Sequence, residues 1–225
     1  MTRGQALLDV ALALLLTLLA GIVVAMAAAL VLERFALPPM LVMALQGVVI
    51  LAGLHLLLAW RGRDWRDIGL TALQGRDLGR AALALLLVFL VNGLFTTLLE
   101  WLAPSVIEAH QEGLAGVAGA LTRGLPLAAV AAIMLFVGLY EEMLARGFLL
   151  SRCRVLLGGV WGPVLLSSLL FGLGHMYQGW LGVVQTALIG VVFAHLVLRW
   201  GSLWPVILAH GALNTISVAL IRSLS

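Results

Sequence analysis

Charged side chains are scarce in this sequence: they make up 10% of its 225 residues, and lysine is absent. A typical soluble domain is about a quarter charged and about half apolar, whereas 63% of these residues are hydrophobic. This composition excludes an ordinary water-soluble globular protein. The thirteen basic residues are all arginine, and no basic cluster with interleaved aromatic residues occurs, so we expect no nucleic-acid partner.

Cysteine is nearly absent as well. The single thiol, Cys153, excludes an internal disulfide and any metal cluster held by several cysteines. A lone thiol beside a membrane segment is most often a small packing residue. We expect no cleavable signal peptide either, because the apolar run at 6–32 is longer than the ~7–15 residues of a signal-peptide core.

What the sequence has instead is long apolar stretches. Crossing the hydrocarbon core of a bilayer takes about 20 apolar residues. Stretches near this length, separated by charged, proline or glycine breaks, lie at 6–32, 40–60, 81–103, 125–149, 160–175, 179–199 and 203–221. They predict an all-α fold, a polytopic transmembrane helical bundle of about seven (seven to eight) helices that forms a single integral membrane domain over 1–225. The amphipathic segment 105–124 is predicted to be an interfacial helix.

The arginines predict the orientation of this bundle, because cytoplasmic loops carry an excess of basic residues. With a cytoplasmic N-terminus, the arginines on the cytoplasmic side are Arg3, Arg61, Arg63, Arg66, Arg76, Arg80, Arg146, Arg152, Arg154 and Arg199. Only Arg34, Arg123 and Arg222 fall on the other side. We therefore expect a cytoplasmic N-terminus. The exclusive use of arginine is typical of a GC-rich genome and indicates the inner membrane of a bacterial cell.

Ionisable residues inside the predicted spans indicate a function, since a charged group at the helix centre costs on the order of 3 kcal/mol on insertion scales. The first three spans hold almost no such residues. The fourth span contains EEMLAR at 141–146, the fifth ends in FGLGH at 171–175, and the seventh contains HGALN at 210–214. This concentration in one half of the chain predicts a localised site. His195 of the sixth span is ambiguous, and a packing role is favoured for it.

Helical spacing gives the two adjacent glutamates different neighbours. Glu142 and Arg146 are four residues apart, the spacing at which an ion pair closes on one helix face, whereas Glu141 lies about 100° away around the helix. Glu142 can therefore be neutralised locally and Glu141 cannot. An unpaired carboxylate in a low-dielectric interior can exchange a proton, which predicts that Glu141 acts as a general base.

The other polar residues suit the hydrolysis of a peptide bond. A carboxylate and an imidazole, Glu141 and His175, can activate water. A second imidazole and a carboxamide, His210 and Asn214, share one helix face and can donate hydrogen bonds to the developing oxyanion. The same groups allow a second use, because a catalytic zinc takes three protein ligands and leaves one position for water. In that case Glu141, His175 and His210 would be the ligands.

The three motifs together resemble those of the CAAX prenyl protease and bacteriocin-processing family of intramembrane proteases, also called CPBP or Abi-like. The resemblance covers about residues 137–218, the catalytic motif region, and consists of EExxxR, FxxxH and HxxxN in the family's order. It implies an intramembrane endopeptidase with the catalytic residues Glu141, His175, His210 and Asn214 and the supporting residues Glu142, Arg146 and Phe171. One departure is Ala145, where the family often has an aromatic residue.

The resemblance leaves the metal question open, since the family has been described both as metal-dependent and as glutamate-dependent. We favour a mechanism that requires no cofactor over one with Zn²⁺, because the candidate ligands come from three separate helices without a short two-ligand motif such as HExxH. The expected partners are the lipid bilayer and a peptide or protein substrate, lipidated or membrane-anchored, that is cleaved near the membrane.

Two functions of other classes use similar residues. Buried glutamate and histidine side chains form proton relays in proton-coupled transporters, but transporters usually have two related halves, and no such repeat is evident here. A non-catalytic membrane immunity or scaffold protein would need only the fold. Measured activity distinguishes both alternatives from a protease.

Overall fold

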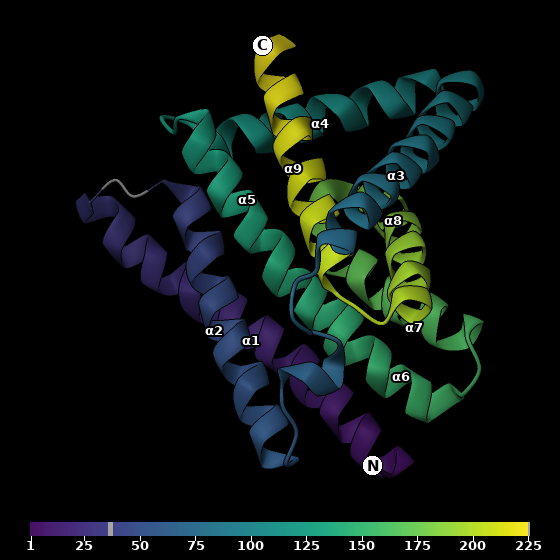
Figure 1. Cartoon of the computed structure of the whole chain (residues 1–225). Coiled ribbons are helices and arrows are strands. Elements are labelled where there is room, and N and C mark those ends of the chain that lie inside the picture. The colour runs from purple at the N-terminus through teal and green to yellow at the C-terminus, as the bar shows by residue number, and fades with distance from the viewer. Residues whose placement is uncertain (36–37, 225) are drawn as a thin grey trace.

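The computed structural model describes the backbone of residues 1–35 and 38–224, and the side chains of residues 1–30 and 38–223. Nearly all of this described chain is helical (Figure 1). In chain order the elements are α1 (Arg3–Phe35), α2 (Pro39–Trp60), the 3₁₀ helix η1 (Trp65–Ile68), α3 (Gly75–Leu102), α4 (Pro104–Thr122), α5 (Leu127–Glu142), the π-helix η2 (Met143–Leu149), α6 (Leu150–Leu157), α7 (Trp161–Leu173), the 3₁₀ helix η3 (Met176–Gln178), α8 (Gly179–Trp200) and α9 (Trp204–Leu224).

The predicted all-α transmembrane bundle is confirmed. Six helical segments in the described part of the chain are long and apolar enough to cross a membrane: Arg3–Leu30, Pro39–Trp60, Gly75–Leu102, Leu127–Leu157, Met176–Trp200 and Trp204–Ser223. The seventh predicted span, 160–175, corresponds to α7, which is apolar but has only 13 residues. At 1.5 Å per residue it is about 20 Å long, shorter than the ~30 Å hydrocarbon core.

Several predicted boundaries differ from the observed ones. The third span begins at Gly75, six residues before the predicted start, with Gln74 and Asp77 forming a capping box. The fourth span, predicted to end at residue 149, continues through η2 and α6 to Leu157. It ends where Gly158 and Gly159 both adopt positive φ angles, which glycine reaches without a steric penalty.

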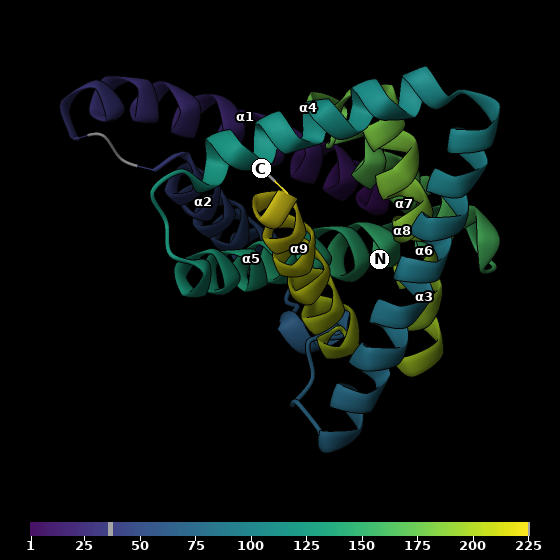
Figure 2. The same ribbon diagram turned by 90° about the horizontal axis from the view of Figure 1, so that it is seen from above.

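The two ends of the chain lie at opposite ends of the bundle (Figure 1). The N-terminus, the end of α2 and α6 gather at one end, whereas the C-terminus and α4 lie at the other, and the view from above shows α4 running across that end (Figure 2). The six long segments alone would return the chain to its starting side, so the opposite ends agree with the predicted seven crossings, in which the short α7 is one of them. Arg34, one of the three arginines expected outside, is beyond the described side chains.

Glycines bring α5 and α9 into close contact, and this contact sets the height of the site. A Cβ added at Gly138 would lie 2.8 Å from the backbone nitrogen of Gly211, and one added at Gly211 would lie 2.8 Å from Cα of Leu135. Only glycine permits so close an approach of two helix backbones. Because Gly138 is one turn before Glu141 and Gly211 follows His210, the contact places these two side chains at the same level.

The fourth span contains a π-helix that periodicity did not predict. Residues Met143–Leu149 of η2 follow directly after the glutamate pair and include Arg146. At Gly147 an added Cβ would meet Cδ1 of Ile68 at 2.9 Å, so the missing side chain lets the loop that contains η1 pack against this segment. Single-turn π segments are frequent at functional sites because they change the register of the side chains that follow.

The first span contains one of the few ionisable residues of the early spans, and this residue is buried. Asp9 is 0% exposed. Its Oδ1 lies 2.7 Å from Nη2 of Arg61 and its Oδ2 lies 3.3 Å from Nε of Arg152. Asp9 therefore ties α1 to the end of α2 and to α6. Sequence spacing could not reveal this contact, because Arg152 is 143 residues away.

Candidate active site

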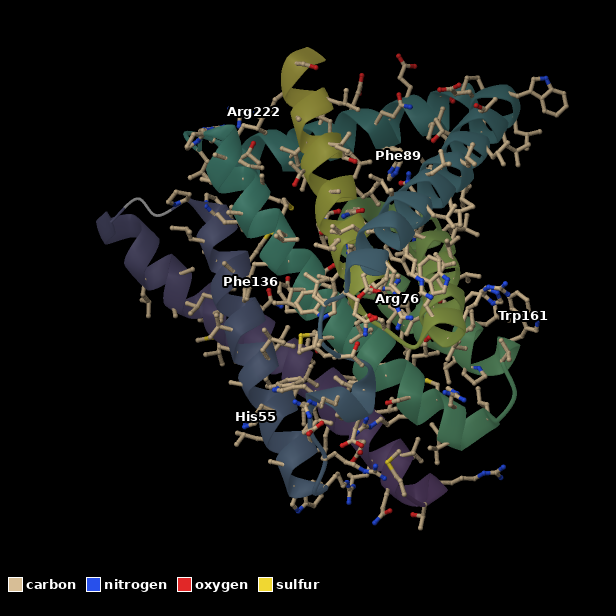
Figure 3. The ribbon with its side chains drawn as sticks, viewed as in Figure 1. His55, Arg76, Phe89, Phe136, Trp161 and Arg222 are labelled. Atoms are coloured by element: carbon tan, nitrogen blue, oxygen red, sulfur yellow. The ribbon has the colours of Figure 1, made fainter. Side chains whose placement is uncertain are left out.

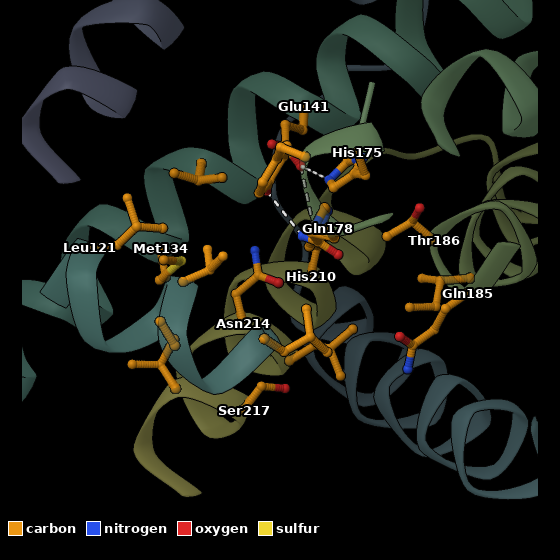
Figure 4. Close-up of a pocket in the computed structure, with 18 of the residues that line it drawn as sticks. Leu121, Met134, Glu141, His175, Gln178, Gln185, Thr186, His210, Asn214 and Ser217 are labelled. Atoms are coloured by element: carbon orange, nitrogen blue, oxygen red, sulfur yellow. Dashed lines mark hydrogen bonds and ion pairs between the residues drawn. The ribbon is translucent and has the colours of Figure 1, made fainter. Parts of the chain in front are cut away.

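A cavity of about 220 Å³ lies between α5, α7, α8, α9 and α4, and polar side chains gather at one part of its wall (Figure 4). Among the predicted site residues, Glu141, Phe171, His175, His210 and Asn214 line this cavity. Figure 4 shows Glu141, His175 and His210 pointing toward one another, with Asn214 beside them. The three sequence motifs, which are up to 73 residues apart in the chain (from 141 to 214), therefore meet in one place.

Glu141 is the carboxylate at the centre of this group. Its Oε2 lies 3.5 Å from Nε2 of His210 and 3.9 Å from Nε2 of His175. Its Oε1 accepts a long hydrogen bond of 3.4 Å from the hydroxyl of Tyr140. Oε2 itself is buried without a hydrogen-bond partner among the described residues. An unsatisfied buried carboxylate oxygen is costly, and because Glu141 lines the cavity, a molecule bound there can donate a hydrogen bond to this oxygen.

Glu142 is fully buried behind the cavity and makes two contacts through one oxygen. Its Oε1 accepts a hydrogen bond of 2.7 Å from Nη1 of Arg146, the predicted pair. The same oxygen lies 2.7 Å from Nδ1 of His210, a contact that the helical spacing did not predict. A carboxylate paired with arginine only accepts hydrogen bonds, so Nδ1 of His210 carries the proton. Nε2 of His210 therefore faces Glu141.

His175 is oriented by its own backbone. It follows α7 at the start of the turn into η3, and its Nδ1 lies 3.0 Å from the carbonyl oxygen of Phe171. A carbonyl oxygen can only accept, so Nδ1 is the donor and, in the neutral ring, Nε2 carries a lone pair. That lone pair is directed toward Glu141.

Phe171 packs against the charged and the imidazole groups of the other motifs. The guanidinium carbon of Arg146 lies 4.0 Å from the centre of its ring, a cation–π contact. The rings of His175 and His210 lie 4.6 Å and 6.0 Å away between centres. Phe171, the first residue of FxxxH, thus packs against the side chains of Arg146, His175 and His210 and fixes the spacing between them.

The cavity has polar residues that sequence reasoning missed. They are Asn92 of α3, Tyr177 and Gln178 of the η3 turn, Gln185 and Thr186 of α8, and Ser217 of α9. Oε1 of Gln185 lies 3.3 Å from Nε2 of His110 in α4, the helix predicted to be interfacial. Because polar residues are common near helix ends, the sequence does not single these residues out. What distinguishes them is that they line the same cavity.

Much of the rest of the cavity wall is apolar. This apolar part is formed by Leu114, Val117, Ala118, Leu121, Met134, Val137, Leu213, Val218 and Ile221. Four of these residues belong to α4, which therefore covers the cavity from one side in addition to lying across the end of the bundle. The cavity thus joins a polar region around Glu141 to an apolar one.

Two other polar residues of the late helices do not line this cavity. His195 stacks on Trp161 at 5.6 Å between ring centres, with an interplanar angle of 15°, and Figure 3 shows Trp161 at the outer edge of the bundle. This supports the favoured packing role for His195. Ser168 of α7 is buried beside Gly190 and is not among the cavity residues.

The described residues contain no group of three or more His, Cys, Asp or Glu side chains arranged to hold a metal ion. The set predicted for zinc, Glu141, His175 and His210, does not meet this arrangement as the side chains stand.

The sequence of this region matches a known family. Residues 123–216 match the family model described as "Type II CAAX prenyl endopeptidase Rce1-like". This match includes all three motifs and confirms the predicted resemblance. Neither the curated proteins nor the solved structures include a significant match to the chain.

Proposed function

We propose that the protein is an intramembrane endopeptidase whose attacking water is activated by Glu141 and His175. The match of residues 123–216 to the family model of Rce1-like CAAX endopeptidases supports this proposal. The observation that carries the proposal is the position of Glu141 Oε2, which is buried, has no hydrogen-bond partner among the described residues and faces Nε2 of both histidines. The reaction requires no metal or other cofactor.

Water is held by two acceptors. The carboxylate of Glu141 and the lone pair on Nε2 of His175 are 3.9 Å apart, so one water molecule can donate a hydrogen to each. As the water oxygen attacks the carbonyl carbon of the scissile bond, its proton passes to Glu141. Glu141 then returns this proton to the departing amine nitrogen when the C–N bond breaks, which leaves the catalyst unchanged.

His210 and Asn214 stabilise the oxyanion. The carboxamide nitrogen of Asn214 is a neutral donor. With Nδ1 of His210 bonded to Glu142, Nε2 can donate only when the ring carries both protons. Glu142 supplies the counter-charge for that state: Glu141 and Glu142 then carry two negative charges, and Arg146 and His210 carry two positive ones. A balanced cluster is the form of buried charge that proteins tolerate best.

The position of the site supports one kind of substrate. The substrate is a peptide or protein that reaches the cavity from the bilayer, with an apolar or lipidated segment against the α4 side of the wall and the scissile bond against Glu141. We place the enzyme in a bacterial inner membrane with its N-terminus in the cytoplasm, because of its arginine distribution and its use of arginine alone.

Comparison of membrane proteomes tests this proposal. Cells producing the wild-type chain and cells producing Glu141→Ala at an equal level are compared for peptides with new C-termini or N-termini. Trimmed termini that occur only with the wild type support the endopeptidase and identify its substrate. Identical sets of termini, with both proteins present in the membrane, would instead favour the non-catalytic alternative.

A further inference from the structure

A second cavity, of about 400 Å³, lies at the end of the bundle that holds the N-terminus. It is lined by Met1, Gln5, Arg61, Arg63, Asp67, Ser151 and Arg152. None of these residues lines the cavity around Glu141, so the two sites are separate. The hydrolytic proposal does not use this cavity.

The cavity wall carries an excess positive charge. Asp9, buried behind it, accepts hydrogen bonds from Arg61 and from Arg152, so one carboxylate faces two guanidinium groups. The remaining pair, Arg63 and Asp67, is neutral as a whole and exposed. One positive charge is therefore left over next to Asp9.

Some of the arginine nitrogens beside this excess charge have no protein acceptor. Arg61 uses Nε and Nη2 to bind Asp9, and Arg152 uses Nε for Asp9 and Nη1 for Ser151. No hydrogen bond to another described residue engages Nη1 of Arg61 or Nη2 of Arg152. The Arg152 side chain is only 5% exposed. Its guanidinium lies over the Phe148 ring, 3.7 Å from the ring centre, and shares the carboxylate of Asp9 with Arg61. One carboxylate balances only one of the two guanidinium groups, so an anion in the cavity would balance the other.

The surroundings of the cavity are those of the boundary between headgroups and acyl chains. It lies at the start of α1, the end of α2 and in α6, where three membrane helices reach one end of the bundle (Figure 1). Trp60, which precedes Arg61, is 60% exposed, and tryptophan is enriched at this level of membranes. Leu8 of α1, three residues after the cavity residue Gln5 and so near it on the helix surface, is 46% exposed and offers apolar surface to an acyl chain.

We propose that this cavity binds the phosphodiester headgroup of an anionic phospholipid, with its acyl chains against the outer face of α1. The single negative charge of a phosphodiester equals the excess charge of the Asp9–Arg61–Arg152 group. Its oxygens suit the planar donor fork of arginine, and basic pockets between membrane helices are known as headgroup sites. The lipid would then fix α1 and α2 to α6.

Lipid binding to the purified full-length chain in neutral detergent tests the proposal. Phosphatidylglycerol and phosphatidylcholine with identical acyl chains are titrated separately, and inorganic phosphate is titrated in a third series. Retained lipid is counted by native mass spectrometry. The main variant is Arg63→Gln, whose side chain is exposed and lies outside the Asp9 pair. The matched control is Arg66→Gln, which makes the same charge change in η1 but does not line the cavity.

We expect phosphatidylglycerol to bind the wild type about tenfold more tightly than phosphatidylcholine, and Arg63→Gln to lose several-fold of this preference while Arg66→Gln keeps it. Equal binding of the two lipids would overturn the proposal, as would equal losses in the two variants. If inorganic phosphate at millimolar concentration binds to the protein and phosphatidylglycerol is not retained, the cavity is a site for a free anion. That result would overturn the proposal of a lipid site. These outcomes are read without hydrolysis, so they are independent of the activity of the Glu141 site.

Discussion

Oε1 of Glu142 lies 2.7 Å from Nδ1 of His210 and joins the first motif of the sequence to the last. The same oxygen is bonded to Arg146 at 2.7 Å. Glu142 therefore has two tasks: it neutralises a buried arginine, and it sets which nitrogen of His210 faces the cavity. These tasks can be separated experimentally, because one concerns stability and the other turnover.

The variant Glu142→Gln should lose both stability and activity. An uncompensated buried Arg146 is expected to lower the free energy of unfolding by about 3 kcal/mol. The double variant Glu142→Gln/Arg146→Met removes both buried charges and should recover most of that loss, measured as thermal unfolding in detergent. Its turnover should stay low, because His210 still lacks its carboxylate. Recovery of turnover together with stability would show that Glu142 has no role toward His210.

The contact between α5 and α9 should depend on two glycines. Gly138→Ala places a methyl group within 2.8 Å of the Gly211 nitrogen, so the helices must separate. We expect a loss of about 1–3 kcal/mol, typical of overpacking, and a larger fractional loss of turnover, because Glu141 and His210 move apart. Gly93→Ala in α3 is the control, since no atom lies within 4 Å of its added Cβ. Equal effects of the two substitutions on thermal unfolding would contradict the packing argument.

His210→Ala and elemental analysis together address metal dependence. In the mechanism without metal, loss of one oxyanion donor lowers the rate by about 10²–10³ and leaves measurable activity. Chelators should leave the wild type active. One equivalent of zinc in the purified, active protein, lost together with activity in His210→Ala, would instead establish a metal mechanism.

The orientation of the bundle is expected to place the N-terminus and the loop 61–74 in the cytoplasm. Single cysteines introduced into a Cys153→Ser background can be tested for labelling by a membrane-impermeant reagent in intact cells. A cysteine at Arg63 should stay unlabelled until the cells are opened, whereas one at Arg123 should react. Strong labelling of the Arg63 position in intact cells would reverse the topology.

Much of this architecture could be predicted from sequence because it depends on local properties. Apolar length gave the spans, and the four-residue spacing gave the ion pair between Glu142 and Arg146. The meeting of His175 and His210 with Glu141 required in addition the resemblance of three motifs to one family. Their roles in catalysis stay predictions.

What could not be predicted depends on contacts across the fold. Asp9 lies in an apolar run whose partners, Arg61 and Arg152, come from distant segments. The π-helix η2 depends on how Gly147 packs against Ile68, which periodicity cannot express. The bond from Glu142 to His210 depends on the spacing of α5 and α9.

The most direct test of the account is the turnover of Glu141→Gln on a substrate identified by the proteome comparison. The amide keeps the shape of the side chain and its contact with Tyr140 but cannot accept the proton of water. We predict that the variant inserts into the membrane and unfolds at a temperature close to that of the wild type. Its rate should be at least about 10³-fold lower, because the variant loses both the general base and the group that positions the water. A Glu141→Gln protein that hydrolyses this substrate at a near-normal rate would contradict the central claim.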